Sequence, residues 1–168
     1  KEVTAPEYLN LNKVVEETEM LLQRLISEDI RLRFNLCSDA ICIHADPGQV
    51  QQILMNLVVN AGDAMPEGGN LDVRLSRVEV DCTLAEKVGV EVGSFAKIRV
   101  EDTGTGMSKE TLQHVFEPFY TTKAVGKGTG LGLSTVYGIV KHSNGSIQIE
   151  TELSAGTSID IYLPLVDV

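Results

Sequence analysis

Hydrophobic and polar positions repeat along this chain with two periods, one typical of helices and one typical of strands. Apolar residues spaced by three or four positions predict amphipathic helices, whereas strict alternation or short apolar runs predict strands. The predicted helices cover residues 12–26, 47–65 and 131–142. The predicted strands cover residues 30–36, 41–45, 71–80, 95–101, 146–152 and 157–163.

The starts of two helices are predicted from capping residues. Asn12 is a candidate N-cap of the first helix. Asp46 precedes Pro47, and Gln49 follows three residues later, which is typical of a capped helix start with proline in the first turn. Residues 81–94 show no clear period and predict an irregular connection, and residues 108–127 predict a short helix followed by a loop.

The order of these elements indicates the fold class. Helices and strands are mixed without strict alternation, which favours a single sheet covered by helices on one face. We therefore predict one α+β domain over residues 1–168, built as a two-layer α/β sandwich with a mixed sheet and about three helices on one face. We also expect a mobile lid between Met107 and Gly128, because glycines flank a stretch with few periodic apolar residues.

Composition and charge exclude some classes of protein. The formal net charge of -10 argues against a nucleic-acid surface, although a local cradle of N–H groups could still hold one small anion. Three cysteines without paired spacing predict neither a disulfide framework nor a zinc site. No apolar run approaches the length of a membrane span, so we expect a cytoplasmic domain without direct membrane contact, whose parent protein can carry an anchor elsewhere.

A polar stripe runs along the predicted helix that follows Asp46. Asn56, Asn60 and Asp63 line one flank, beside an apolar face. A solvated surface would give the same spacing. Asparagine is, however, a mediocre helix former, and its amide oxygen is a ligand type that Mg²⁺ accepts.

Two glycine-rich turns follow. Asp102 ends a strand before Gly104 and Gly106, which places a carboxylate beside backbone that a ligand can approach closely. Alternating glycines then lead into the last helix, and such an N-terminus is a recurrent phosphate site. The spacing matches neither a Walker A loop nor a Rossmann fingerprint. Each turn alone is equally compatible with an ordinary surface loop. The alternating glycines are Gly126, Gly128, Gly130 and Gly132.

Four motifs in a fixed order give the chain a family resemblance. They are Asn56-Leu57-Val58-Val59-Asn60-Ala61, Asp102-Thr103-Gly104-Thr105-Gly106-Met107, Phe116-Glu117-Pro118-Phe119-Tyr120-Thr121-Thr122-Lys123 and Gly128-Thr129-Gly130-Leu131-Gly132-Leu133. Together they resemble the N, G1, F and G2 boxes of sensor histidine kinases, in particular the nitrogen-regulatory and hybrid-kinase branch. The resemblance covers about residues 8–163 and implies the Bergerat ATP-binding fold.

The resemblance also implies roles for individual residues. Asn60 would bind Mg²⁺, and Asn56 and Lys123 would lie at the phosphate end as further catalytic residues. Asp102 would accept a hydrogen bond from the adenine amine. Phe116 and Phe119 would anchor the lid, although core packing explains them equally well. The remaining residues expected to bind ATP are Asp63, Gly104, Gly106, Met107, Phe119, Thr122, Gly128, Thr129, Gly130, Leu131 and Gly132.

The expected reaction is phosphoryl transfer from ATP to a histidine. The related ATPases carry a glutamate base where this chain has Asn56, and an amide cannot act as a base. His44, His114 and His142 lack the acceptor context of the family. The acceptor is therefore expected on a helical-hairpin dimerisation domain preceding Lys1, with a response regulator receiver domain as the further partner and the fragment itself monomeric.

Three other functions remain open from the sequence. An ATP-hydrolysing clamp of the topoisomerase or chaperone type shares the fold, and Asp63 keeps a spacing found in those ATPases. An anti-sigma-type serine kinase shares it too. A degenerate nucleotide-sensing module would need no catalysis.

Overall fold

The computed structural model of the chain describes residues 5–121 and 132–166. The strands are β1 (Glu7–Asn10), β2 (Ile30–Asn35), β3 (Cys42–Ala45), β4 (Gly69–Val80), β5 (Gly93–Asp102), β6 (Ser146–Glu152) and β7 (Gly156–Pro164). The helices are α1 (Leu11–Arg24), α2 (Pro47–Asp63), α3 (Cys82–Val88), α4 (Lys109–His114) and α5 (Gly132–His142). Every strand and long helix predicted from the sequence is therefore confirmed, with ends shifted by a few residues.

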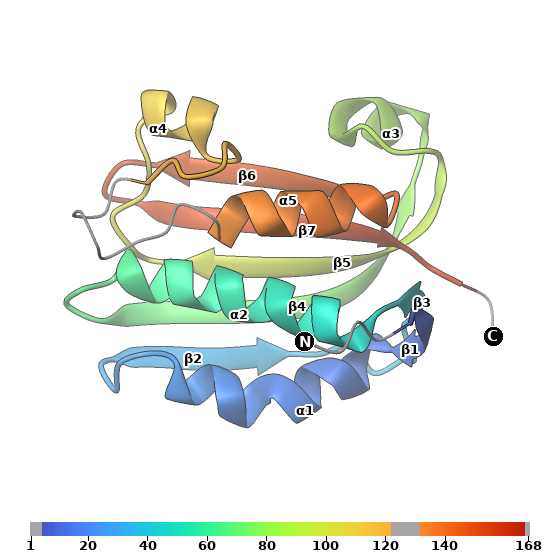
Figure 1. Ribbon diagram of the computed structural model, residues 1–168, viewed down its shortest axis with the longest axis horizontal. Coiled ribbons are helices and arrows are strands. Elements are labelled where there is room, and N and C mark those ends of the chain that lie inside the picture. Colours follow the sequence, from blue (N-terminus) through green and yellow to red (C-terminus); the bar gives the residue numbers. More distant parts are fainter. Residues whose placement is uncertain (1–4, 122–131, 167–168) are drawn as a thin grey trace.

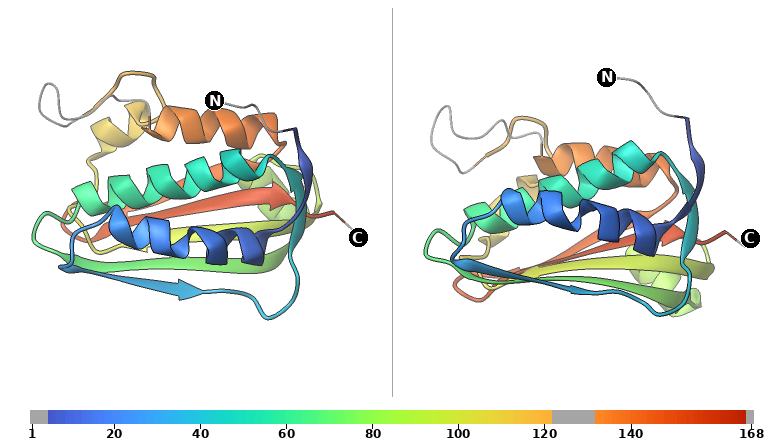
Figure 2. Two further views of the ribbon diagram at one scale, coloured as in Figure 1. Left: turned by 60° about the horizontal axis from the view of Figure 1, so that its bottom comes forward. Right: turned by 90° about the horizontal axis from the view of Figure 1, so that it is seen from below.

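The sheet is mixed and is covered by helices on one face (Figure 1). It has five strands in the order β2-β4-β5-β7-β6, in which only the β2–β4 pair is parallel. A separate antiparallel pair of β1 and β3 lies at one end. Figure 2 shows α1, α2 and α5 in one layer above the sheet, which is the predicted two-layer α+β sandwich.

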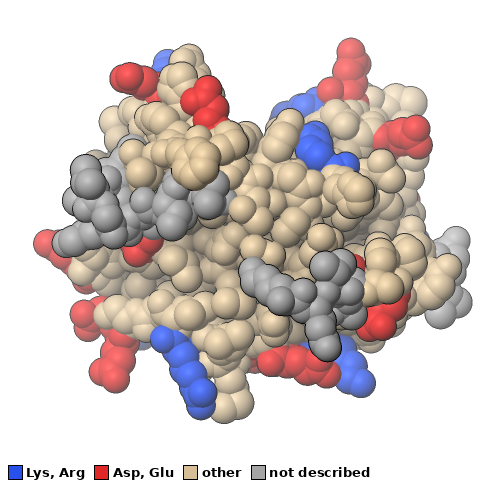
Figure 3. All heavy atoms as spheres, viewed as in Figure 1, with Lys and Arg blue, Asp and Glu red and all other residues tan. Residues whose placement is uncertain are grey.

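The hydrophobic core lies between these two layers. The apolar face of α2, including Leu54, Leu57 and Val58, is almost fully buried. It packs in one cluster with inward side chains of the sheet such as Leu71 and Ile98. On the helix-covered face most Lys, Arg, Asp and Glu side chains lie around the rim (Figure 3). The core therefore fixes the rotation of α2 about its axis, and with it the direction of the polar stripe.

Helix capping is confirmed for α2 and corrected for α1. The Asp46 carboxylate accepts a hydrogen bond from the Gly48 N–H at 2.8 Å, as expected of an N-cap. Asn12, by contrast, is not the N-cap of α1, because the helix begins at Leu11 after Asn10. The Asn12 amide instead donates to the carbonyl oxygens of Cys37 and Asp39 at 3.0 and 2.8 Å, tying α1 to the loop before β3.

The prediction of an irregular connection over residues 81–94 is wrong, because α3 forms there. The Asp81 carboxylate caps this helix by accepting from the Leu84 N–H at 2.9 Å. Ala85 and Val88 pack with Phe95 and Tyr162 in a second small cluster. Because α3 has only seven residues, its sequence is too short to show a period.

The face of the sheet opposite the three long helices is covered by α3 at one end only (Figure 2). Residues that alternate with the core positions of β4 and β5, such as Arg74, Lys97 and Arg99, therefore lie on a largely open face. Within residues 5–121 and 132–166, no helix has the length and apolar character needed to cross a membrane.

Candidate functional site

A cavity of about 410 Å³ opens between α2, the end of β5, the segment after α4 and the start of α5. Cavities of this size are typical of small-molecule sites. The residues from α2 and the turn after it are Met55, Asn56, Leu57, Val59, Asn60, Ala61, Asp63 and Ala64. The others are Val100, Asp102, Thr105, Gly106, Met107, Thr111, Val115, Tyr120, Thr121, Gly132, Leu133, Thr157 and Ile159.

The polar stripe of α2 forms one wall of this cavity. The Asn56 Nδ2 donates to the carbonyl oxygen of Gly132, 76 positions later, at 3.2 Å. Asn60 lies one turn further along the helix against the same glycine, and a Cβ built on Gly132 would be 3.3 Å from the Asn60 Nδ2. Glycine at this position therefore lets the N-terminus of α5 lie directly against the two asparagines.

Asp102 is at the other end of the cavity, where β5 ends. Only 8% of its surface is exposed, and its Oδ1 accepts from the Gly104 N–H at 2.8 Å. Burial raises the pKa of Asp102, and the backbone N–H groups of Gly104 and Thr157 offset part of that rise. The carboxylate is thus a fixed hydrogen-bond acceptor within the cavity wall.

The turn after Asp102 is held on both sides by backbone. A Cβ on Gly104 would lie 2.5 Å from the Ala64 carbonyl oxygen, to which Thr105 donates at 2.9 Å. Gly106 has a φ of 68°, and a Cβ there would lie 2.0 Å from the carbonyl oxygen of Glu152. Both glycines are therefore required by close packing between the end of α2 and the β6–β7 hairpin.

The structure brings many of the predicted site residues to one cavity. Those that line it are Asn56, Asn60, Asp63, Asp102, Gly106, Met107 and Gly132. Gly104 lies behind the wall, against Asp102 and Ala64. Another group of predicted residues lies outside the described part of the chain, namely Thr122, Lys123, Gly128, Thr129, Gly130 and Leu131.

The two phenylalanines of the third motif lie in different surroundings. Phe116 is partly buried and stacks on Tyr137 with 4.9 Å between ring centroids, which agrees with core packing. Phe119 does not line the cavity. Its side chain is 75% exposed, and its φ is 67°.

Several lining residues were not singled out from the sequence. Thr157 and Ile159 reach the cavity from β7, because Thr157 is the cross-strand partner of Asp102. That register depends on long-range pairing and leaves no local pattern. Tyr120 and Thr121 also line the cavity. Both belong to the third sequence motif, so that motif could have been used to predict them.

A buried carboxylate, an amide-bearing helix and a helix N-terminus around one cavity suit a small ligand that carries both hydrogen-bond donors and an anionic group. The family model described as histidine kinase-, DNA gyrase B-, and HSP90-like ATPase matches residues 45–167. The chain belongs to this family.

Its sequence relatives include sensor kinases. Sensor kinase CckA of Brucella abortus (strain 2308) is 43% identical over 98% of this chain. Sporulation kinase A of Bacillus subtilis (strain 168) and sensor histidine kinase ZraS of Escherichia coli (strain K12) are each 33% identical over 94% of it. The chain spans only 18%, 24% and 30% of these three proteins, respectively.

Solved structures agree with the fold. The mycobacterial sensor histidine kinase MprB has a TM-score of 0.75 at 22% identity, with 98% of this chain and 100% of that chain covered. The catalytic domain of histidine kinase ThkA, in a nucleotide-free form, has a TM-score of 0.73 at 25% identity, with 96% of both chains covered. The predicted fold of a histidine kinase catalytic domain is thereby confirmed.

Proposed function

We propose that this chain binds Mg-ATP and donates the γ-phosphoryl group to a histidine on a separate helical-hairpin domain, as part of two-component signalling. The observation that carries the proposal is the convergence on one cavity of Asp102, Asn60 and the N-terminus of α5 at Gly132. These groups offer an acceptor for an adenine amine, an oxygen ligand for a hard cation and N–H groups for phosphate.

The metal assignment rests on the chemistry of the side chains present. Among the described residues no group of three or more His, Cys, Asp or Glu could hold a metal ion. Mg²⁺ does not require such a group, because it keeps several waters and shares the phosphates of its nucleotide. Asn60 would hold it through its amide oxygen, and the bound ion would neutralise charge on the phosphates.

The contact made by Asn56 favours phosphoryl transfer over hydrolysis. Its amide N–H donates to the Gly132 carbonyl, which a glutamate at this position could not do. Asn56 therefore joins α2 to α5, and it has no basic group with which to activate water. The assignment of Lys123 to the terminal phosphate remains a prediction from the motif, as do those of Thr122, Gly128, Thr129, Gly130 and Leu131.

The decisive experiment supplies the acceptor separately. The chain is incubated with γ-labelled ATP, Mg²⁺ and the histidine hairpin domain of its own parent protein, beside an acceptor variant in which that histidine is replaced. We expect label on the hairpin that acid removes and alkali does not, and none on the variant. Acid-stable label would support the serine kinase, whereas steady phosphate release without the hairpin would support the hydrolytic clamp.

Partners follow from the same proposal. The hairpin is the direct substrate, and a receiver domain of a response regulator would take the phosphoryl group from it. If a receiver domain is phosphorylated only when both this chain and the hairpin are present, that result would support this order of phosphoryl transfer. Loss of ATP binding in Asn60→Ala and Asp102→Asn, with folding retained, would tie the reaction to this cavity.

A further inference from the structure

A second hollow lies on the open face of the sheet, opposite the helices and away from the first cavity. It has a volume of about 490 Å³, which lies within the usual range of ligand sites. Its residues come from β4 and β5, and from the end of β2 with the loop that follows. They are Asn35, Leu36, Cys37, Arg74, Leu75, Ser76, Lys97, Arg99 and Glu101.

Hydrogen-bond donors are concentrated at the centre of this hollow. Arg74 on β4 is the cross-strand partner of Arg99 on β5, and Ser76 is the partner of Lys97. The four positions form a rectangle of three cations and one hydroxyl. Directly opposed like charges on neighbouring strands destabilise a sheet, so the Arg74–Arg99 pair carries a cost that other contacts must offset.

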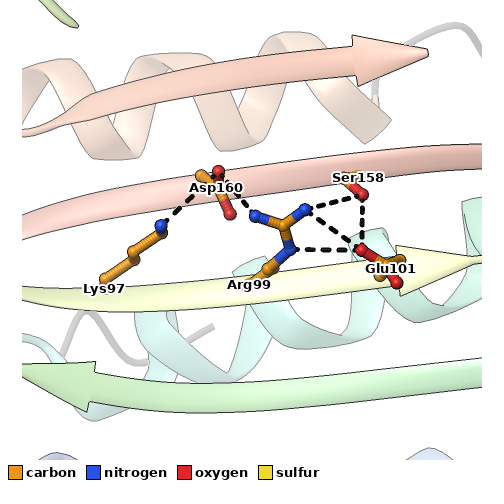
Figure 4. A network of polar contacts seen from close by, with 5 residues as sticks. All are labelled: Lys97, Arg99, Glu101, Ser158 and Asp160. Carbon is orange, nitrogen blue, oxygen red and sulfur yellow. Dashed lines mark hydrogen bonds and ion pairs between the residues drawn. The ribbon is translucent and has the colours of Figure 1, made fainter.

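Carboxylates on the same face contact two of these cations, Lys97 and Arg99 (Figure 4). Glu101 and Asp160 pair with Arg99, at 3.1 and 3.5 Å, and Asp160 lies 3.9 Å from Lys97. The charge of Glu150 also acts on Arg99 and helps to raise its pKa. Glu101 is also occupied by the hydroxyl of Ser158 at 2.9 Å.

Arg74 is the cation of the hollow that makes no direct contact with these carboxylates. Among residues 5–121 and 132–166 its guanidinium forms no ion pair and no hydrogen bond, although its charge helps to lower the pKa of Glu101. Among the described residues that line the hollow, Glu101 is the one carboxylate, against three cations. A charge-assisted acceptor in direct contact is therefore missing beside Arg74, whereas Lys97 has only the long ion pair with Asp160.

We propose that this hollow binds a small organic anion that carries phosphate groups. A phosphate placed over Ser76 would accept from Arg74 and Lys97, and would relieve the repulsion between Arg74 and Arg99. The concave shape favours a small molecule over a macromolecular partner. The formal charge of -10 on the whole chain also disfavours a long polyanion, which would meet acidic surface beyond the hollow.

This site is independent of the proposed ATP site. Among the described strands, β5 alone lines both hollows. Its Lys97 and Arg99 line the hollow on the open face, and Asp102 at its end lines the first cavity. No lining residue is shared between the two. Binding at one can therefore be measured while the other is disabled.

The test is a titration of the ¹⁵N-labelled chain with pyrophosphate, without Mg²⁺ and at low salt, followed by amide chemical shifts. We expect saturable shifts at the amides of Arg74, Ser76 and Lys97. These shifts should persist in Asn60→Ala, which disables only the other cavity. The double variant Arg74→Gln, Lys97→Gln should weaken binding by at least about tenfold, since each charge-assisted hydrogen bond contributes more than a neutral one.

Two further variants keep the test decisive. Arg77→Gln removes an arginine of the same strand that pairs with Glu79 at 3.3 Å away from the hollow, and should leave binding unchanged. Ser76→Asp places an acceptor among the cations, so it should abolish binding while retaining or raising stability. Linear shifts without saturation, or equal losses in Arg77→Gln, would overturn the proposal. So would tighter binding of a hexaglutamate peptide at the same amides, which would make the hollow a docking surface for acidic protein.

Discussion

Replacing Asp102 by asparagine tests the proposed adenine end of the cavity with little change in shape. In the wild-type chain one carboxylate oxygen, Oδ1, already accepts from the Gly104 N–H at 2.8 Å. The backbone of Thr157 also hydrogen-bonds this carboxylate, whose remaining lone pairs are available to a ligand amine. Asparagine replaces one carboxylate oxygen with an NH₂ donor, so when its oxygen stays with the Gly104 N–H, the NH₂ group faces the ligand amine and that amine loses its acceptor.

The size of the effect follows from that loss. A hydrogen-bonding group left unsatisfied in a buried site costs about 1–3 kcal/mol, which corresponds to a loss of roughly 5–150-fold in affinity for adenine nucleotides. Inorganic triphosphate makes no contact with an adenine acceptor, so its affinity should stay within about twofold of the wild-type value. The selectivity between the two ligands should therefore fall.

Isothermal titration of both ligands into wild type and Asp102→Asn measures this selectivity. Asp46→Asn is a matched control, because Asp46 is equally buried, at 9% exposed against 8%, and asparagine also caps helices well. Equal losses for ATP and triphosphate, or no loss for ATP, would refute the adenine role of Asp102. A fall in melting temperature that accounts for the lost affinity would refute it too.

Four other predictions follow from the same geometry. Gly132→Ala should push the Asn60 amide aside and weaken the binding of Mg-ATP at least about tenfold, as measured by titration. Gly138→Ala is the control, because no atom lies within 4 Å of its new Cβ. It should leave binding intact and stabilise α5 by up to about 1 kcal/mol in urea unfolding. Asn56→Glu should raise ATP hydrolysis by the chain alone at least about tenfold, as a positioned base can. Asn56→Gln should not, and equal rates in the two variants would contradict the protective role of Asn56. Burial raises the pKa of Asp102 in the folded chain. The protonated Asp102 side chain therefore stabilises the fold fully below the unfolded pKa of about 3.9, and this stabilisation is lost as pH rises through the folded pKa. Over that pH range the free energy of unfolding of Asp102→Asn should increase relative to that of wild type. Asp81→Ala should cost about 1 kcal/mol in unfolding free energy by removing the cap of α3, and an unchanged midpoint would argue that α3 needs no cap.

Local patterns were sufficient to predict most of the fold. The period of α2, the acidic cap at Asp46 and the alternation in β2 each depend on neighbours within a few residues, and all three are confirmed. The seven residues of α3 were missed, because the helix depends on packing against Phe95 and Tyr162 from distant strands.

The candidate site was also predicted only where local sequence patterns were sufficient. Asn56, Asn60 and Asp102 were predicted from spacing and motif order, and the structure places them around one cavity. Thr157 could not be predicted, because only the β5–β7 register brings it beside Asp102. The second hollow was missed for the same reason, since the approach of Arg74 to Arg99 depends on how β4 and β5 align.

The backbone clamp around the Asp102 turn has a consequence for the order of assembly. Gly106 is packed against Glu152, and a Cβ on Gly156 would lie 2.1 Å from the carbonyl oxygen of Asp102. Both partners belong to the β6–β7 hairpin, about fifty residues later in translation. Such distant contacts close late in folding. A nascent chain can therefore form α2 with its asparagines long before the opposite end of the cavity takes shape, and competence to hold a ligand would arise only when the last hairpin docks.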